Sequence, residues 1–481
     1  MLSILHLSDL HRDPANPISN SVLIDSLERD RDRYTCDANN PVQSPDLVVV
    51  TGDIVQGVKS GTPNADDVLR KQYDEATIFL GDLANRFLAG DRSRLVLVPG
   101  NHDVSDDVFR RCLSPIDIQS RSSRMLIQEL FSPRSLMRWS WPEFQFYEIT
   151  DVDLYNLRFK AFADFYEEFY QGERQFSLDP TEQFDIFDYP EFGVTIVGFC
   201  SCYNNDLLNR QGAIHPDCIG DASTRLRRPE YQDRLRIAAW HHNTEGPPMQ
   251  VDYMDPEIIQ NLIDCGISVG LHGHQHRPEF LDTRFKHGPD RRITIVSSGT
   301  LCGDAAFHHA RAYNLIVIDV AGRSGKVHLR EMQNADLQLP IWGVRSMSPG
   351  FESFLSFKFD APPKPYVSAD SVTMDLIQAN KHLDSGDDDA AAKLLRPLAG
   401  SNELARRLLL DCEVRLKNAN GILSLFMPPT ADAEVIAVLD ALWAEGKYDE
   451  LRLVLELPIV STSNDPSVIE MRTKYEAKLK R

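Results

Sequence analysis

Short runs of apolar and β-branched residues recur along the first two thirds of the sequence, and several end in clusters of Asp, Asn, Gly or His. Runs of about four to eight such residues bounded by turn formers are typical of buried strands. Stretches with helical periodicity separate them, for example residues 66–87 and 255–265. This alternation predicts an α/β fold with polar groups at the ends of central strands. The predicted strands cover residues 46–51, 94–99, 193–199, 235–240, 267–271, 292–298 and 313–320.

The chain of 481 residues is too long for one ordinary core. Residues 1–345 carry the α/β pattern, interrupted over about 104–190 by an insertion that we expect to be helical, with Trp139, Trp141 and an aromatic-rich helix over 154–171. A stripe of aromatic side chains at helical spacing predicts packing against a core rather than a surface for stacking bases. Because the insertion follows a candidate catalytic loop, we also expect it to form a wall of the site.

Residues 346–365 are rich in Pro, Ser and Phe and predict a linker, and residues 366–481 then turn helical. Two helix–glycine–helix patterns, centred on Gly386 and Gly446, lie 60 residues apart in this last segment. That spacing is close to two units of about 30–34 residues, the repeat of helical-hairpin arrays. The segment therefore predicts a small all-α, tetratricopeptide-like domain, with an irregular helical bundle as the alternative.

The composition restricts the partners and the compartment. With 51 Lys and Arg against 71 Asp and Glu, the net charge is −20, which argues against broad binding to nucleic acid or anionic lipid but leaves room for a local basic groove. The sequence shows no stretch of about 18 apolar residues and no signal-peptide pattern. Its eight cysteines have no regular spacing and are typical of free thiols in a reducing compartment. We therefore expect a cytoplasmic protein that does not enter a membrane.

Five fragments rich in metal-ligand residues lie in order at or near the ends of predicted strands. Hydrolysis of a phosphate ester near neutral pH needs a hydroxide nucleophile and neutralisation of the charge that grows on the phosphoryl oxygens. Two metal ions about 3.5–4 Å apart supply both, provided that a carboxylate bridges them and neutral ligands keep the site positive. The mixture of histidines, aspartates and one asparagine amide meets that need. The fragments are Asp9-Leu10-His11, Gly52-Asp53, Gly100-Asn101-His102-Asp103, His241-His242 and Gly273-His274-Gln275-His276.

This ordered set resembles the motifs of the calcineurin-like metallophosphoesterase superfamily over about residues 1–330. The resemblance implies a four-layer α/β/β/α sandwich of two mixed sheets, and two divalent metal ions whose bridging hydroxide attacks the phosphate. It assigns Asp9, His11 and His276 to the first ion. It assigns Asn101, His241 and His274 to the second ion, with Asp53 as the bridge.

The resemblance also implies that His102 acts on the leaving-group oxygen and that Asp103 orients His102 through a hydrogen bond. At the fourth motif either His241 or His242 can be the ligand, and His241 better matches the family position. His6 and His272 precede their motifs in apolar strands, so we expect structural roles for both. We expect His308 and His309 to line a loop.

Ligand hardness restricts the metal only loosely. A set of His, carboxylate and amide ligands without thiolate suits Mn, Fe or Zn, and Mn2+ is expected from relatives of this type. Residues 54–56, which follow Gly52-Asp53, lack the tyrosine that binds ferric iron in purple phosphatases. Substrate contacts are expected from His242 and from the loop after a central strand, at Asn204, Asn205 and Arg210.

Four functions remain open, and a phosphodiesterase for a nucleotide-type substrate is favoured. A DNA or RNA nuclease of the SbcD-like type is the alternative, weakened by the net charge and the lack of a basic tract. A phosphoprotein phosphatase would carry Asp-Arg after the second motif, which this sequence lacks, and a non-catalytic scaffold has no need of the full ligand set. The helical segment has 14 basic and 19 acidic residues, which favours contact with a protein partner or self-association over nucleic-acid binding.

Overall fold

In the computed structural model the chain forms two units, Met1–Pro365 and Tyr366–Arg481. Each unit has its own cluster of buried apolar side chains. The structure describes residues 1–37, 41–117, 123–131, 135–246, 252–286, 291–306, 309–345, 353–360 and 369–480.

The first sheet of the N-terminal unit is mixed. Its central strands β1, β2 and β3 run parallel, and β1 also pairs antiparallel with β13. These three strands are buried along their whole length, as expected of strands covered on both faces. The order across the described sheet is β15 (Trp342–Val344), β14 (Ser324–Met332), β13 (Ala312–Asp319), β1 (Leu2–Leu7), β2 (Leu47–Thr51) and β3 (Leu95–Val98), and β16 (Leu355–Lys358) also pairs with β14.

The second sheet is mixed as well, with four parallel strands, β8, β9, β10 and β12, between antiparallel edges. All seven predicted strands are present in the two sheets, each within two residues of its predicted ends. The order is β11 (Phe280–Arg284), β12 (Arg292–Ser297), β10 (Val269–His272), β9 (Leu235–Ala239), β8 (Val194–Phe199) and β7 (Phe184–Tyr189).

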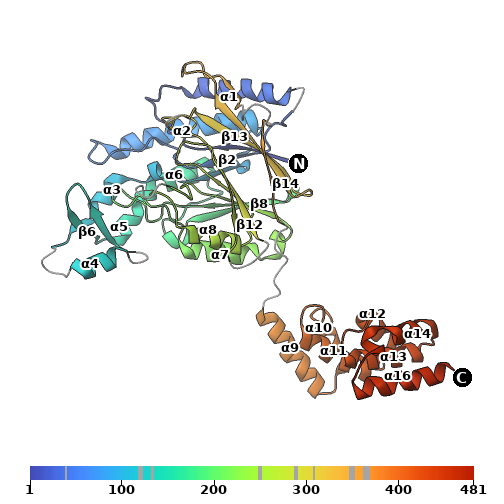
Figure 1. Ribbon diagram of the computed structural model, residues 1–481. Helices are drawn as coiled ribbons and strands as arrows, with labels where there is room; N and C mark the ends of the chain where they lie inside the picture. The colour runs from blue at the N-terminus through green and yellow to red at the C-terminus, as the bar shows by residue number, and fades with distance from the viewer. Residues whose placement is uncertain are drawn as a thin grey trace. The chain divides into compact units, whose positions relative to one another are not determined.

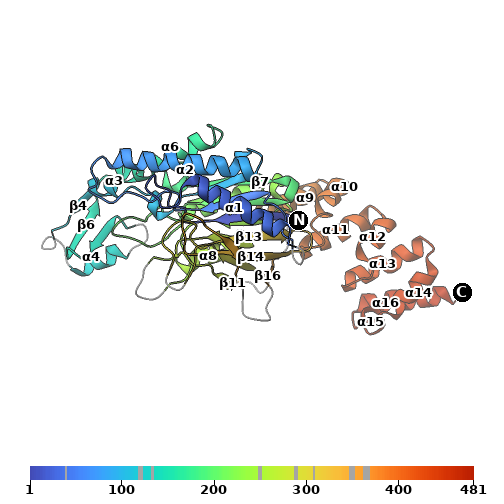
Figure 2. The ribbon, with the colours of Figure 1, turned by 90° about the horizontal axis from the view of Figure 1, so that it is seen from above.

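The two sheets lie between two layers of helices (Figure 1). Helices α1 (Asn20–Thr35) and α2 (Ala65–Phe87) cover the first sheet, and Figure 2 shows α1 above β13 and β14. Helices α7 (Pro216–Leu226) and α8 (Pro256–Asp264) pack on the second sheet. The facing strands β3 and β8 approach closely, since a Cβ at Gly198 would lie 2.9 Å from Val98 Cγ1. The four-layer sandwich expected from the sequence is confirmed.

The insertion differs from the helical prediction. A three-stranded antiparallel sheet forms much of it, and cross-strand aromatic pairs stabilise that sheet: the rings of Trp139 and Phe146 lie 4.5 Å apart. The predicted helix 154–171 is broken by a tight turn at Leu157–Phe159. Its aromatic stripe is buried in the main core, as predicted. The elements are α3 (Asp106–Arg111), β4 (Leu113–Pro115), α4 (Ser123–Leu130), β5 (Met137–Ser140), β6 (Gln145–Ile149), α5 (Val152–Asn156) and α6 (Lys160–Phe169).

The predicted linker 346–365 needs a correction, because its middle is strand β16. Phe357 is buried and lies against Gly325 of β14, where a Cβ would be 2.2 Å from its ring. Leu355 and Phe357, two apolar residues at alternating positions, are the signal in this Pro-rich segment for a short strand that pairs with β14. Residues 346–352 and 361–365 of the predicted linker lie outside the described residues.

The C-terminal unit is all-α over its described part. Consecutive helices pack against each other, and the two predicted turns, at Gly386 and Gly446, have positive φ values of 79° and 68°. A side chain there would be strained, which explains glycine at both turns. The helices are α9 (Ala369–Asp384), α10 (Asp388–Leu395), α11 (Glu403–Arg415), α12 (Ala419–Phe426), α13 (Asp432–Ala444), α14 (Tyr448–Glu456), α15 (Pro458–Ser461) and α16 (Pro466–Leu479).

Among the described residues no helix is long and apolar enough to span a membrane. All eight cysteines are free thiols, and six of them are buried.

Candidate metal centre

Parallel strands from both sheets bring the five fragments to one place. Asp9 and His11 follow β1, Asp53 follows β2, and the fragment with Asn101 follows β3 in the first sheet. In the second sheet the remaining two fragments follow β9 and β10. Backbone bonds connect neighbouring loops: the Asp9 N–H donates to the Gly52 carbonyl at 3.1 Å and the His11 N–H to the Asp53 carbonyl at 2.9 Å. The carboxyl ends of parallel strands thus form the site.

Asp9, His11, Asp53 and His276 form the first ligand cluster. One ligand atom from each lies within 4.8 Å of all the others. The Nε2 atoms of His11 and His276 are 3.2 Å apart, and His276 Nε2 is 3.2 Å from Asp9 Oδ1. Such convergence of ring nitrogens and carboxylates is the donor set of a divalent transition metal.

Asn101, His241 and His274 form the second cluster. Asn101 Oδ1 lies 3.0 Å from His241 Nε2 and 2.9 Å from His274 Nδ1, and these two nitrogens are 3.2 Å apart. Asp53 lies between the clusters, with Oδ1 3.3 Å from His241 Nε2 and Oδ2 3.8 Å from His11 Nε2. One carboxylate therefore directs an oxygen toward each cluster.

The geometry favours His241 over His242 as the ligand. Both ring nitrogens of His242 are engaged away from the cluster, Nδ1 with the Ser201 hydroxyl at 2.9 Å and Nε2 with the Asn205 amide at 3.2 Å. His242 is fully buried and supports the site from behind, which corrects its assignment to substrate contact.

Backbone conformation and unpaired polar atoms test whether these residues fit metal ions. Asp9, His11, Asp53, His274 and His276 have φ values between 44° and 79°, in the left-handed region that costs energy for residues other than glycine. Among the described residues, the close polar neighbour of the buried Asp9 Oδ1 is His276 Nε2, at 3.2 Å and without the geometry of a hydrogen bond. A strained backbone that gathers carboxylate oxygens and imidazole nitrogens at one point fits a cation, so the donor set is suitable for metal.

The electrostatics of the metal-free protein agree with that conclusion. Burial lowers the pKa of His241 and of His276, but the carboxylates of Asp53 and Asp9 respectively outweigh it and raise each to about 9. Burial opposes ionisation of Asp9, but His276 lowers its pKa to about 2, and His241 likewise holds the pKa of Asp53 well below its usual value. Protons on two imidazoles thus supply the positive charge that the carboxylates require.

Three oxygen atoms orient the imidazole ligands. His241 Nδ1 donates to the Thr51 carbonyl at 2.8 Å, and His276 Nδ1 donates to the Asp304 carbonyl. His274 Nε2 faces Asp252 Oδ2 at 3.7 Å. Such outer partners fix the rings of metal-ligating histidines. Asp252, in the segment before α8, was not predicted, and no motif in the sequence marks it.

The role predicted for Asp103 is wrong. His102 and Asp103 share a tight turn, Asn101–Asp103, but His102 is 37% exposed at its side chain while Asp103 is buried. His102 Nδ1 bonds to the Gln56 carbonyl at 2.6 Å. The Asp103 carboxylate accepts bonds from the N–H groups of Gly100, Ile54 and Val55 and from the Tyr73 hydroxyl, at 2.8, 3.2, 3.4 and 3.2 Å.

The remaining predicted residues lie around this centre. His6 and His272 are buried beneath it; burial lowers their pKa values to about 3 and 4, and His6 Nε2 contacts the Thr51 hydroxyl at 3.1 Å. The loop after β8 carries Asn204, Asn205 and Arg210. His309 follows a turn at Ala306, and His308 lies outside the described residues.

A model of the calcineurin-like phosphoesterase family matches residues 2–278 of the chain. Among solved structures, a dimetal phosphatase from Danio rerio is similar at 10% identity with a TM-score of 0.38, over 71% of this chain and 98% of that one. The protein TT1561 of Thermus thermophilus is similar at 11% identity with a TM-score of 0.32, over 68% and 97%. The purple acid phosphatase PPD1 from yellow lupin, Lupinus luteus, is similar at 10% and 0.39, over 69% and 51%. No functionally curated protein sequence matches the chain.

Proposed function

The chain belongs to the calcineurin-like phosphoesterase family, which makes it a metal-dependent phosphoester hydrolase, and we propose that it cleaves phosphodiester bonds of a nucleotide-type substrate. The observation that carries this proposal is Asp53. Its two oxygens lie toward two separate clusters of ligands, the arrangement that a pair of divalent cations requires.

Each side chain of the centre has a role in this proposal. Asp9, His11 and His276 would hold one ion, Asn101, His241 and His274 the other, and Asp53 both. When bound, two such ions lower the pKa of a coordinated water and offset the charge on the phosphoryl oxygens.

His102 would supply a proton to the leaving-group oxygen. The Gln56 carbonyl accepts from Nδ1, which fixes the ring and leaves Nε2 facing the centre, 3.9 Å from Asp53 Oδ2. The side chain is partly exposed, so the ring can meet a substrate without crossing the core. A positioned imidazole of this kind contributes about 10²–10⁴-fold to a proton-transfer step.

Mn2+ is the metal we propose, with Fe or Zn as the alternatives, because the donor set is oxygen and imidazole without thiolate. The C-terminal helical unit is proposed to contact a protein partner or a second copy of the chain, and the cytoplasmic location stays a prediction. A chain ending at Lys364 that kept the same oligomeric mass and the same partners would contradict the role of the helical unit.

A panel of substrates in Mn2+ tests the function. We expect bis-p-nitrophenyl phosphate to be hydrolysed faster than p-nitrophenyl phosphate, and short nucleotide diesters faster than single- or double-stranded DNA. Chelation should abolish all activity, and added Mn2+, Fe2+ or Zn2+ should restore it in an order that identifies the metal. A preference for monoesters would refute the diesterase proposal, and a preference for DNA would favour the nuclease alternative.

A further inference from the structure

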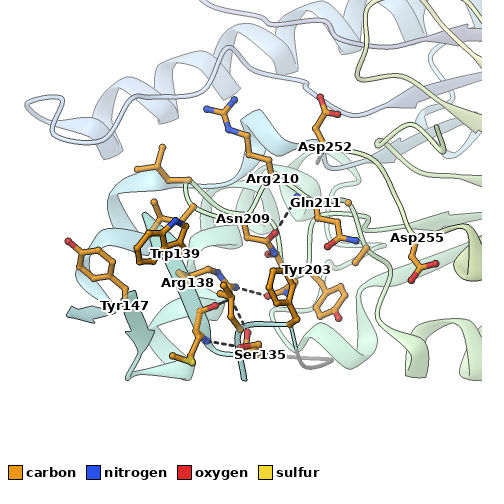
Figure 3. A pocket seen from close by; sticks show the side chains of 18 of the residues that line it. Ser135, Arg138, Trp139, Tyr147, Tyr203, Asn209, Arg210, Gln211, Asp252 and Asp255 are labelled. Carbon is orange, nitrogen blue, oxygen red and sulfur yellow. Dashed lines mark hydrogen bonds between the residues drawn. The ribbon is translucent and has the colours of Figure 1, made fainter. Parts of the chain in front are cut away.

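Figure 3 shows a large cleft of about 1340 Å³. The insertion forms one side, with residues of α3, β5 and β6, and the loop after β8 forms the other. Asp252, which faces the His274 ring, also lines it, so this residue connects the cleft with the centre. Its volume exceeds the roughly 300–1,000 Å³ of ordinary small-molecule sites.

Two buried arginines of the insertion fix the loop side of the cleft. Arg138 donates to Asp206 at 2.7 Å and to Asn204 Oδ1 at 2.6 Å. Arg158 donates to the carbonyls of Tyr203 and Asn205 and lies 3.6 Å from the Tyr155 ring centroid. Because buried, hydrogen-bonded guanidinium groups hold both walls together, the cleft is preformed.

Two exposed arginines in the cleft have no close ion pair within the described part of the chain. Arg110 of α3 and Arg210 of the loop make no ion pair with any other residue that the structure describes. Burial raises the pKa of the Asp106 carboxyl, but both guanidinium groups act to lower it, and Arg210 also acts to lower that of Asp252, so the two arginines lie near the loop that carries the proposed proton donor. Unpaired guanidinium groups beside a phosphoester centre are suited to a second anionic group of the substrate.

Aromatic side chains line the walls of the same cleft. Trp139 and Tyr147 lie on the insertion side and Tyr203 on the loop side, with Asn209 and Gln211 between them and Arg210 (Figure 3). Rings next to amides and guanidinium groups combine a stacking surface with hydrogen-bond donors and acceptors. A planar heterocycle with attached phosphate has the complementary chemistry.

We propose that this cleft binds the nucleoside and a second phosphate group of the substrate, so that the substrate class is a small nucleotide carrying more than one phosphate. The inference rests on the proposed function and adds the specificity site to it. Acidic side chains at the start of α8, Asp252, Asp255 and Glu257, line the same cleft and disfavour a long polyanion. The net charge of −20 acts in the same direction.

Calorimetric titration of the Mn2+-loaded full chain with AMP, ADP and ribose 5-phosphate tests the cleft directly. We expect AMP to bind about tenfold more tightly than ribose 5-phosphate, the contribution of one stacked base. Trp139→Leu should remove most of that difference, and Trp139→Phe, which keeps a ring, should retain it. Arg210→Ala should remove the advantage of ADP over AMP, whereas Arg70→Ala, an exposed arginine of α2, should change neither ratio.

Equal affinities for AMP and ribose 5-phosphate, or unchanged ratios in Trp139→Leu and Arg210→Ala, would overturn the inference. Tighter binding of a single-stranded oligonucleotide of about 20 residues than of ADP would replace the small nucleotide by nucleic acid. The same ligands as inhibitors of methyl p-nitrophenyl phosphate hydrolysis should give the same ranking. If no metal supports that hydrolysis, the proposed function fails, while calorimetry still decides the occupant of the cleft.

Discussion

Replacement of Asp103 by alanine is expected to destabilise the N-terminal unit strongly. The carboxylate is buried and accepts four hydrogen bonds, from three backbone N–H groups in the loops after β2 and β3 and from the Tyr73 hydroxyl. Three of these bonds are 3.2 Å or shorter. At about 1–2 kcal/mol for each buried donor left unpaired, Asp103→Ala should cost about 3–6 kcal/mol. A typical domain has only about 5–15 kcal/mol of stability in total.

Urea denaturation followed by circular dichroism measures this loss. The C-terminal unit has its own core, so its transition serves as an internal reference, and Asp107→Ala, at a half-buried aspartate in the first turn of α3, serves as a matched control. Asp103→Asn keeps one acceptor oxygen and should lose about half as much as alanine. His102→Ala should leave the unfolding free energy within about 0.5 kcal/mol.

A loss below about 1 kcal/mol in Asp103→Ala, with activity reduced as in His102→Ala, would refute this reasoning. That pair of results would mean that Asp103 orients the imidazole, as the motif alone suggests, and that the observed bonds to the two loops have no energetic weight.

Four further substitutions test the centre and the helical unit. Asp53→Ala should abolish turnover and the binding of both metals, measured by elemental analysis, because it removes the shared carboxylate. His102→Ala should reduce kcat about 100-fold with metals retained; equal metal loss in both variants would contradict the division of roles. Asp252→Asn should weaken metal retention about tenfold in chelator competition, and an unchanged affinity would dismiss it as a support of His274. Burial raises the pKa of Glu434, but the hydrogen bonds from Arg406 and Thr430 outweigh burial and lower it. The contribution of Glu434 to the free energy of unfolding is therefore complete above the pKa of the unfolded state and is lost as the pH falls through the pKa of the folded state. The urea concentration at the unfolding midpoint of the helical unit should therefore decrease as the pH is lowered below about 4, and Glu434→Gln should weaken this pH dependence.

Much of the site could be predicted because each motif follows a strand. A parallel strand fixes where its last residue lies, so Asp53 and His241 were found from the apolar runs before them. The resemblance to the calcineurin-like superfamily then implied which residues share an ion.

The direction of a side chain within a turn could not be predicted from the sequence. His102 and Asp103 are neighbours in one turn, yet one ring lies at the surface and the other group is buried under two loops. Asp252 faces His274 from a loop, and a loop has no periodicity from which such a contact could be predicted. The sheet of the insertion was missed because its strands are only 3, 4 and 5 residues long, too short to show a clear alternation.

The left-handed backbone of five ligand residues affects the order in which metal binding and the folded structure are lost. At about 1 kcal/mol or more for each, their conformations together cost roughly as much as the whole stability of a marginal domain. The packing of the two sheets must therefore offset the free energy that these five residues would gain by leaving the left-handed region. A substitution far from the centre, such as one that leaves a cavity between β3 and β8, should let the ligand residues leave their strained conformations well before the domain unfolds. Metal affinity would then respond to a loss of core packing more sensitively than the unfolding free energy does.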